Sequence, residues 1–269
     1  MNFCRLLAIA LFAAPVCAFA QPADLARLEA SPRHHEWVEV KRGEHVVHTF
    51  VAYPEKSGKT AAVILIHENR GLTDWVRATA DKLAGEGYLV LAPDLLSGTG
   101  PNGGRTKDFA SGDAAREAIG KLKAPDVVAD LGAVADYAKT IPSASGTLFV
   151  GGFCWGGGRT WDFAAARADL LGAFVFYGTP GDGTLENAKK IPCAVYGFYG
   201  GNDARVNSTL EKSGAALKAA GKTFEPVIYD GAGHAFMRLG EEATPTPANK
   251  KAMEEAWVRL LKLLASTHS

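Results

Sequence analysis

The feature that most limits the fold of this sequence is an alternation of short apolar runs with longer amphipathic segments. Six apolar runs of four to seven residues stand between polar and glycine-rich stretches, at 61–67, 88–91, 147–153, 172–177, 193–199 and 223–229. Runs that are apolar at nearly every position are typical of parallel strands covered by helices on both faces. Apolar residues repeat every three or four positions over 127–138 and 253–264, which predicts amphipathic helices. The pattern predicts a doubly wound α/β fold with a mostly parallel sheet.

The region before residue 54 has a different pattern. Residues 36–41 and 45–53 have strand composition and are separated by a short turn at 42–44 that contains a glycine. This spacing predicts an antiparallel hairpin at the N-terminal side of the sheet. A polar lead-in with a short helix is expected over 21–33. Because no internal repeat or long linker divides the sequence, we expect residues 21–269 to form a single domain.

The first twenty residues have the pattern of a secretory signal peptide. Arg5 precedes an apolar stretch at 6–16, and Ala18 and Ala20 flank Phe19 as the small residues of a cleavage site. The apolar stretch is shorter than the roughly 20 residues needed to span a bilayer. We therefore expect an exported protein, periplasmic or secreted, that has no membrane segment after cleavage.

Composition places the chain among ordinary globular proteins. Of its 269 residues, 47% are apolar, which excludes intrinsic disorder. Twenty-nine basic and 29 acidic residues balance, so nothing indicates a nucleic-acid partner or an anionic membrane surface. We expect a monomer whose partner is a small molecule. After cleavage only Cys154 and Cys193 remain. An oxidising compartment favours a disulfide between them. Their local sequences instead favour two free thiols, with Cys154 presented in a glycine-flanked turn and Cys193 buried in an apolar run.

The strongest motif is the segment Gly152-Phe153-Cys154-Trp155-Gly156, which directly follows an apolar run and precedes a helix-like segment. G-x-C-x-G in this position has the form of a nucleophile elbow with cysteine in place of serine. The chemistry needs the glycines because the nucleophile occupies a strained strand-to-helix turn. The helix N-terminus behind it favours the thiolate form. The alternative is a buried cysteine in a glycine-rich turn.

Two further residues follow predicted strands in the order expected of a catalytic triad. Asp203 comes just after the run 193–199, and His234 lies in a loop just after the run 223–229. Both are therefore expected at the carboxyl edge of the sheet, where open α/β sheets bind ligands. Taken alone, Asp203 is typical of a turn and His234 of an exposed loop. Together with Cys154, in the order nucleophile, acid, base, they predict a Cys-His-Asp triad.

These motifs, with the segment Ile-His-Glu-Asn-Arg-Gly at 66–71, resemble the dienelactone hydrolase family of α/β-hydrolases over about residues 36–264. The resemblance implies that Cys154 is the nucleophile and that His234 acts as general base and then general acid. It also implies that Asp203 orients the imidazole.

The same resemblance implies roles for the residues around the nucleophile. Glu68 would contact the resting thiol and take part in switching it to thiolate when substrate binds. The backbone N–H groups of Trp155 and Asn69 would form the oxyanion hole. From the residues alone, a carboxylate beside Cys154 would keep the thiol protonated, which protects it from oxidation. The alternative is a solvated glutamate paired with Arg70.

Arg238, four residues after His234, matches a family arginine that holds the substrate carboxylate, which suits a guanidinium fork. The family's second arginine, in the loop after the strand end Ala-Pro-Asp at 92–94, has no match at 95–98. The first arginine there is Arg105, beyond the glycine-rich stretch 97–104, and we expect it to be solvated. That stretch lacks the spacing of a phosphate-binding motif and is expected to be a mobile loop.

No metal site is proposed. His67 and Glu68 lack the second histidine of a zinc helix, and His45 and His48 do not share a strand face. Side chains and backbone donors can supply the chemistry, so we expect no cofactor.

The sequence therefore predicts a hydrolase that cleaves a small ester or lactone through an acyl-cysteine intermediate. Cleavage of a carbon–carbon or carbon–halogen bond on the same fold is a related alternative. The alternative from another class is a non-catalytic module that senses oxidation through Cys154. The intact acid and base weigh against that alternative, since a sensor needs neither.

Overall fold

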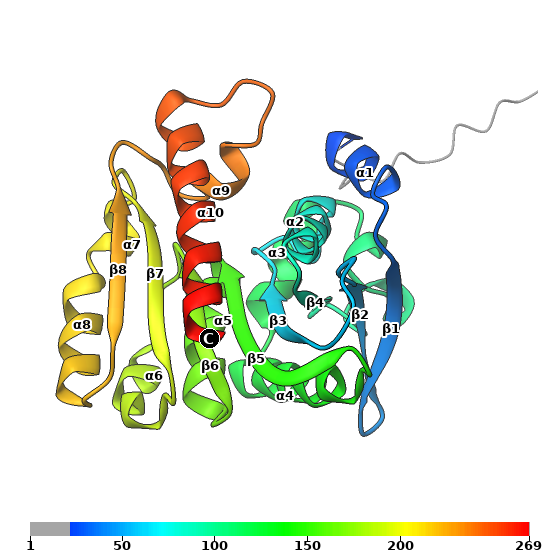
Figure 1. Ribbon diagram of the computed structural model, residues 1–269, viewed down its shortest axis with the longest axis horizontal. Helices are drawn as coiled ribbons and strands as arrows, with labels where there is room; N and C mark the ends of the chain where they lie inside the picture. Colours follow the sequence, from blue (N-terminus) through cyan, green and yellow to red (C-terminus); the bar gives the residue numbers. More distant parts are fainter. Residues whose placement is uncertain (1–21, 269) are drawn as a thin grey trace, which may run out of the picture.

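An eight-stranded sheet runs through the structure in the order β1-β2-β4-β3-β5-β6-β7-β8 (Figure 1). The computed structural model describes residues 22–268, so the expected signal peptide at 1–20 lies outside the described residues. The strands are β1 (His35–Arg42), β2 (His45–Ala52), β3 (Thr60–Ile66), β4 (Leu89–Pro93), β5 (Ala144–Phe153), β6 (Leu170–Phe176), β7 (Ala194–Gly200) and β8 (Phe224–Tyr229).

Strands β4, β3, β5, β6, β7 and β8 pair in parallel. Strand β2 pairs antiparallel with both β1 and β4, which attaches the hairpin to the parallel part. The predicted fold class, a doubly wound and mostly parallel sheet with an N-terminal antiparallel hairpin, is confirmed.

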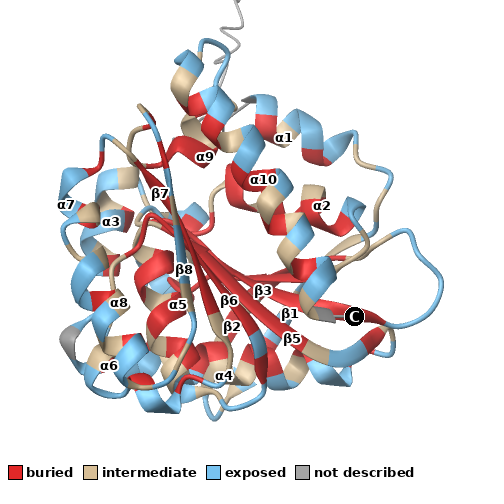
Figure 2. Ribbon diagram, turned by 60° about the vertical axis from the view of Figure 1, so that its left-hand side comes forward, coloured by how far each residue is buried: buried red, intermediate tan, exposed pale blue. Residues whose placement is uncertain are grey.

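Helices cover both faces of the sheet (Figures 1 and 2). Helices α2, α9 and α10 pack on one face, and α4, α5 and α8 pack on the other. The helices are α1 (Pro22–Glu29), α2 (Asp74–Gly85), α3 (Gly112–Lys121), α4 (Ala124–Thr140), α5 (Trp155–Ala166), α6 (Asp182–Glu186), α7 (Ala204–Asn207), α8 (Leu210–Ala219), α9 (Phe236–Leu239) and α10 (Pro247–His268). Short 3₁₀ turns occur at Pro101–Gly103, Thr106–Asp108 and Ala188–Lys190. The two helices expected from periodicity correspond to α4 and to part of α10.

The central strands are buried on both faces, as Figure 2 shows. In β3 every residue is buried. Val63 and Leu65 face the cluster under α2 and α10, while Ile64 and Ile66 face the cluster under α4 and α5. Alternation of side chains along a strand explains this division. Continuous apolar runs in the sequence are the consequence.

Strand β8 departs from the expectation that every run is apolar on both faces. It is the last strand at one edge of the sheet, and the side chain of Ile228 is 54% exposed. An edge strand has a neighbour on one side only, so parts of it remain open to solvent.

The N-terminal segment is attached to α2 by a network centred on Asp81. Its carboxylate accepts hydrogen bonds from Ser31 Oγ at 2.7 Å, and from Arg33 Nε and Nη2 at 2.7 and 2.6 Å. His35 Nε2 lies 2.6 Å from the same carboxylate. Helix α1 also packs against α2, so the region before the hairpin forms part of the fold.

The glycine-rich stretch 97–104 folds into consecutive tight turns, closed by a hydrogen bond from Gly100 N to the carbonyl of Gly104. Within residues 22–268, no helix combines the length and the apolar character required to cross a bilayer.

Candidate active site

A strained turn presents Cys154 between β5 and α5. Its backbone angles are φ 55° and ψ −112°, and a residue with a side chain rarely adopts a positive φ. The flanking glycines are required because backbones approach closely here. A Cβ atom at Gly156 would lie 2.4 Å from the carbonyl oxygen of His67, and one at Gly152 would lie 2.4 Å from that of Gly156. The predicted elbow geometry is therefore present.

The structure brings the three predicted triad residues into one hydrogen-bonded chain. Cys154 Sγ lies 3.1 Å from His234 Nε2, and His234 Nδ1 lies 2.5 Å from Asp203 Oδ2. With Nδ1–H donating to the carboxylate, Nε2 is left to accept from the thiol. Asp203 is buried, and its second oxygen caps α7 by accepting from Val206 N at 3.4 Å. Asp203 thus caps a turn and also contacts His234, so its position fits both of the roles that the sequence left as alternatives.

The environment of Cys154 favours the neutral thiol. Burial raises the pKa of this thiol, and the negative charge of Glu68 raises it further. The Trp155 backbone N–H and the charge of Arg205 lower the pKa, but by less. The N-terminus of α5 thus acts in the predicted direction through the Trp155 amide, but burial and the charge of Glu68 outweigh it in the resting site.

Glu68 is buried and held by an arginine. Its Oε2 accepts a hydrogen bond from Arg238 Nε at 2.9 Å, while its Oε1 has no hydrogen-bond partner among the described residues. The alternative of a solvated glutamate paired with Arg70 is wrong, since Glu68 is buried and forms its ion pair with Arg238. Glu68 acts on Cys154 through its charge, and no hydrogen bond joins the two side chains within residues 22–268.

Arg238 lies in α9, directly after the loop of His234. Burial lowers the pKa of its guanidinium, and the adjacent Glu68 carboxylate raises it by more, so the group is firmly charged. Its Nη1 lies 3.7 Å from Glu242 on the exposed side, and the side chain is 27% exposed. A substrate anion arriving from solvent could therefore reach this cation.

Tyr177 is a site residue that the motifs did not reveal. It follows β6 at a positive φ of 42°, is 1% exposed, and packs its ring 5.1 Å from that of His234. Burial and the charge of Glu68 raise the pKa of its phenol well above the usual value. The available signal was its position at the carboxyl end of a buried run, directly before Gly178.

His67 organises the segment expected to supply the second oxyanion donor. Its Nδ1–H donates to the carbonyl of Glu68 at 2.8 Å, and its Nε2 accepts from Leu95 N at 3.2 Å. Burial lowers the pKa of His67, so the imidazole is neutral. The Trp155 ring stacks on it at 5.4 Å. Asn69 lies two residues after His67 and is half-buried. The two expected oxyanion residues thus belong to segments that meet at His67.

Two expectations about other residues are resolved by the structure. Cys154 and Cys193 are both free, so the disulfide alternative is wrong. Burial raises the pKa of Cys193 to about 12, which makes it an unreactive thiol. Arg105 is half-buried and stacks on Trp37, so the expectation of a merely solvated cation is also wrong. Within the described residues, no group of three or more His, Cys, Asp or Glu side chains is arranged to hold a metal.

Comparison with known proteins agrees with this architecture. The profile of the dienelactone hydrolase family matches residues 47–268. A candidate carboxymethylenebutenolidase of Salmonella typhimurium is 34% identical over 230 residues, covering 80% of this chain and 81% of that protein. The crystal structure of a candidate dienelactone hydrolase from Klebsiella pneumoniae is 27% identical with a TM-score of 0.76, and covers 87% of this chain and 98% of that one.

A dienelactone hydrolase-like promiscuous phosphotriesterase from metagenomic libraries shares the fold at 20% identity and a TM-score of 0.73, over 87% of this chain and 98% of that one. The match of the family profile to most of the chain, together with the 34% identical relative, shows the family. The chain belongs to the dienelactone hydrolase family, whose members are hydrolytic enzymes with the α/β-hydrolase fold.

Proposed function

We propose that this protein hydrolyses small esters or lactones through a covalent intermediate on Cys154. The observation that carries the proposal is the continuous hydrogen-bonded chain from Cys154 Sγ through His234 to Asp203, with spacings of 3.1 and 2.5 Å. Proton transfer needs donor and acceptor at such distances. The name of the Salmonella typhimurium relative denotes action on a butenolide, which is a lactone, and agrees with this class.

In the acylation step, His234 Nε2 takes the proton of the Cys154 thiol as sulfur attacks the carbonyl carbon. The oxyanion that forms accepts hydrogen bonds from the backbone N–H groups of Trp155 and Asn69. When the intermediate collapses, the carbon–oxygen bond of the ester breaks, and the departing oxygen takes the proton from the imidazolium. The product is an acyl–Cys154 thioester, and a lactone leaves its alcohol tethered to the acyl group.

In the deacylation step, His234 takes a proton from water, which attacks the thioester carbonyl. The carbon–sulfur bond then breaks, the carboxylic acid is released, and the imidazolium returns its proton to sulfur. Asp203 accepts from Nδ1–H throughout and stabilises the imidazolium of each step. Each proton transfer uses His234, so the cycle requires no cofactor.

Glu68 and Arg238 supply a means of coupling substrate binding to thiol activation. In the resting site the Arg238 guanidinium holds Glu68, whose charge raises the pKa of Cys154. A substrate with an anionic group would compete with Glu68 for that guanidinium. Movement of the Glu68 carboxylate away from sulfur would lower the thiol pKa at the moment when a nucleophile is needed. This supports an acidic ester or lactone as the substrate class.

The rival function, a non-catalytic thiol sensor, fits the site less well. Oxidation of cysteine proceeds through the thiolate. Burial and Glu68 both raise the pKa of Cys154, which slows that chemistry in the absence of substrate. The site therefore favours a thiol that becomes reactive only when substrate binds.

The proposal is tested by incubating the protein with a panel of aryl esters and lactones. We expect a burst of product equal to the enzyme concentration, followed by a slower steady state, and a mass increase on the peptide containing Cys154 that matches the acyl group. Hydrolysis of these substrates without any adduct, even after acid quenching within the burst, would refute the acyl-cysteine mechanism.

We also propose, on the strength of residues 1–20, that the protein acts outside the cytoplasm, and separately that it is a monomer. Cell fractionation with sequencing of the mature N-terminus tests the first part, with Gln21 as the expected first residue. Recovery of an uncleaved chain with the cytoplasmic fraction would refute it. Sedimentation of the purified protein tests the second part.

A further inference from the structure

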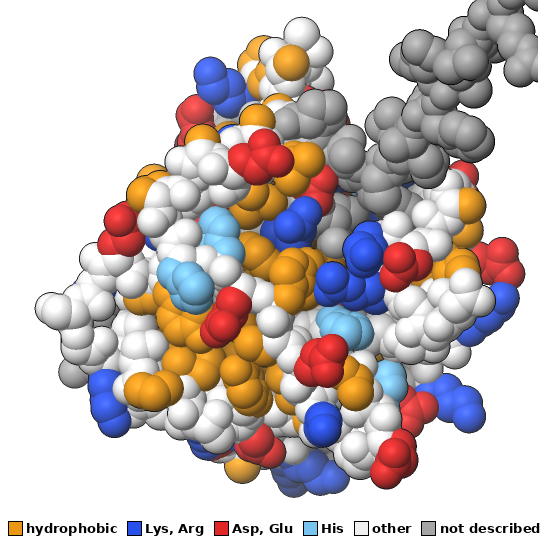
Figure 3. Space-filling model, turned by 90° about the vertical axis from the view of Figure 1, so that its right-hand side faces the viewer, with side chains coloured by type: hydrophobic (Ala, Val, Ile, Leu, Met, Phe, Trp, Pro, Cys, Tyr) orange, Lys and Arg blue, Asp and Glu red, His pale blue; other side chains and the backbone are white. Residues whose placement is uncertain are grey.

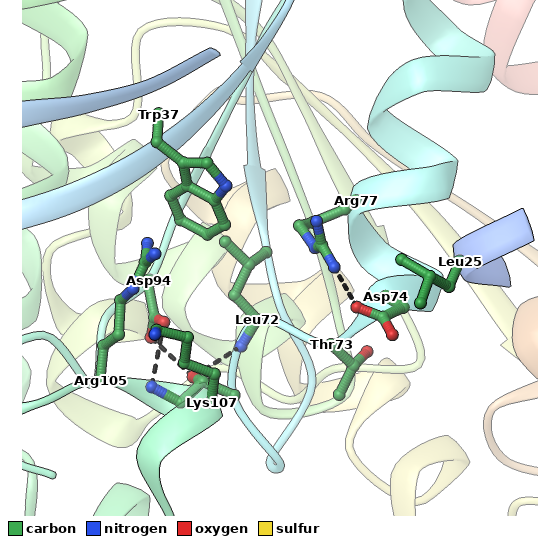
Figure 4. Close-up of a pocket in the computed structure, with 10 residues that line it drawn as sticks. Leu25, Trp37, Leu72, Thr73, Asp74, Arg77, Asp94, Arg105 and Lys107 are labelled. Atoms are coloured by element: carbon green, nitrogen blue, oxygen red, sulfur yellow. Dashed lines mark hydrogen bonds and ion pairs between the residues drawn. The ribbon is translucent and has the colours of Figure 1, made fainter. Parts of the chain in front are cut away.

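A cavity of about 270 Å³ lies between α1, β1, the start of α2 and the segment around the 3₁₀ turn Thr106–Asp108 (Figure 4). The described residues that line this cavity include neither the proposed triad nor Glu68 or Arg238. It borders the loop that carries Glu68, because Leu72 lines it. The cavity therefore lies beside the candidate active site and is lined by a different set of residues.

The cavity combines an aromatic surface with positive charge. The Trp37 side chain is 40% exposed although it is large and apolar. The guanidinium carbon of Arg105 lies 3.7 Å from the centroid of its ring, and that of Arg77 lies 5.9 Å from it. Figure 4 shows the two arginines on opposite sides of the cavity with Leu72 between them. Figure 3 shows basic side chains gathered beside apolar surface on the face turned to the viewer.

The two arginines differ in how their charges are balanced. Arg77 forms an ion pair with Asp74. No carboxylate within residues 22–268 pairs with the guanidinium of Arg105, and its buried Nη1 has no hydrogen-bond partner there. Asp94 also lines the cavity, but its oxygens are engaged by Thr106 Oγ1 at 2.6 Å and Thr106 N at 3.0 Å. Arg105 therefore presents a positive charge that lacks an anion.

Hydrogen bonds hold the backbone at Arg105 and at the residue after it, and the Arg105 guanidinium stacks on Trp37. Its backbone N–H donates to Asp108 Oδ2 at 2.8 Å. The next residue, Thr106, is bound to Asp94, and its hydroxyl accepts from Leu72 N at 3.0 Å. A cation held in this way loses little conformational entropy when a ligand binds. The cavity thus has a preformed wall.

One side of the cavity comes from the part of the chain that precedes the family match. Trp37 in β1 and Leu25 in α1 lie before residue 47, where the family profile begins. The aromatic surface is therefore supplied by the N-terminal segment of this chain.

We propose that this cavity binds a small aromatic carboxylate. Its ring would lie against Trp37 and the two leucines, and its carboxylate would meet Arg105. Guanidinium groups bind carboxylates as planar forks, and aromatic rings pack favourably on tryptophan. A small rotation of the guanidinium would let a carboxylate oxygen also accept from Nη1. The site neither uses nor requires the chemistry at Cys154, so it stands independently of the proposed function.

The test is calorimetric titration of the Cys154→Ala variant with three probes of similar size. Benzoate carries both recognised features, benzamide lacks the charge, and cyclohexanecarboxylate lacks the aromatic ring. We expect benzoate to bind about tenfold or more tightly than either of the others. Absence of benzoate binding, or equal binding of all three probes, would overturn the proposal.

Four further substitutions in the same background locate the binding. Arg105→Gln and Trp37→Leu should each weaken benzoate binding by about tenfold or more, and Trp37→Leu should also remove the preference over cyclohexanecarboxylate. Arg116→Gln, an equal charge change at an exposed position of α3, should leave binding unchanged. Arg238→Gln should do the same. Loss of binding in Arg238→Gln with retention in Arg105→Gln would place the ligand in the active site and overturn the proposal. Circular dichroism checks that each variant is folded. If Arg105→Gln does not fold, the benzoate affinity of Trp37→Leu alone decides whether the ligand binds in this cavity.

Discussion

The backbone strain at Cys154 is part of how the residue is presented. A positive φ at a residue with a Cβ atom costs of order 1–3 kcal/mol and persists only where the surroundings enforce it. Here the strained conformation is held by the close packing of backbone against backbone at Gly152 and Gly156, neither of which has a side chain. Because these contacts do not involve sulfur, the turn should survive replacement of the nucleophile.

Cys154→Ala should therefore abolish ester hydrolysis and leave the fold intact. Loss of a triad nucleophile lowers kcat by a factor of at least about 10³. The measurement is kcat on an aryl ester, with circular dichroism and thermal unfolding as the check on structure. Retention of wild-type turnover by a folded variant would remove Cys154 from the mechanism.

Glu68→Gln should make the free thiol more reactive. Removing the negative charge lowers the pKa of Cys154, so the thiolate fraction below that pKa rises about tenfold for each unit of change. We expect faster alkylation by iodoacetamide at pH 6–8 and slower single-turnover acylation by an acidic substrate.

Glu117→Gln, an exposed change on α3, is the matched control and should leave both rates unchanged. An alkylation profile of Glu68→Gln that coincides with wild type at every pH would mean that Glu68 does not influence the sulfur.

At the residue scale, the structure brings together those residues for which the sequence contains a local marker. Cys154 has its glycines, and Asp203 and His234 follow predicted strands, so the structure brings these three together. The ion pair between Glu68 and Arg238 joins residues 170 positions apart, and no local pattern encodes which arginine a glutamate meets. Tyr177 was missed for a related reason, since its role depends on packing against a histidine from another loop.

At the scale of elements, the elbow depends on how closely α5 approaches the end of β3. The missing side chain at Gly156 lets the helix start directly under the carbonyl groups of Ile66 and His67, at 2.5 and 2.4 Å from where a Cβ atom would be. The atoms that a side chain at Gly156 would meet are backbone atoms, which cannot move aside as a flexible side chain can.

Gly156→Ala should therefore destabilise the protein by at least about 1–3 kcal/mol, the usual range for overpacking. Gly132→Ala, within α4 and with open space around its Cβ position, is the matched control. It should stabilise by about 0.5–1 kcal/mol, because alanine favours helix over glycine. Urea unfolding of both variants gives the two free energies, and equal values would show that the close approach at Gly156 carries no constraint.

Elements were predictable to the extent that burial is uniform along them. Strands in the middle of the sheet are apolar throughout and were found from sequence, as β3 illustrates. Strand β8 has exposed positions because, among the described residues, no further strand pairs with its outer edge, so its burial pattern differs from that of the central strands. The antiparallel pairing of β2 with β4 joins strands that are distant in sequence, and hydrophobic pattern alone does not specify a partner.

At the scale of the whole molecule, Asp81 ties the N-terminal segment to α2. Burial raises the pKa of Asp81, but hydrogen bonds from Arg33, Ser31 and His35 lower it by more, so it lies below the usual 3.8. A carboxyl group with a depressed folded-state pKa stabilises the fold above its unfolded pKa. That contribution is lost as the pH falls through the folded-state value.

Asp81→Asn should accordingly lower stability by about 1–3 kcal/mol at pH 7, the range for hydrogen bonds to a charged group. The difference from wild type should shrink as the pH falls below about 4. Asp113→Asn, at an exposed position of α3, is the control and should change little at either pH. Thermal unfolding across pH 3–7 is the measurement; a difference independent of pH would mean that the charge of Asp81 is not what stabilises.

The strand order has a consequence for when the enzyme becomes active during folding. Cys154 follows β5 in the middle of the sheet, whereas the proposed general base, His234, lies 80 residues later and follows the edge strand β8. Sheet edges are among the regions that open locally at low free-energy cost, and contacts between distant positions form late. Hydrolytic competence is therefore acquired only when the last strand has docked, so turnover reports completion of the fold. Local opening of the β8 edge would move His234 away from sulfur while Cys154 keeps its position, and hydrolysis would stop.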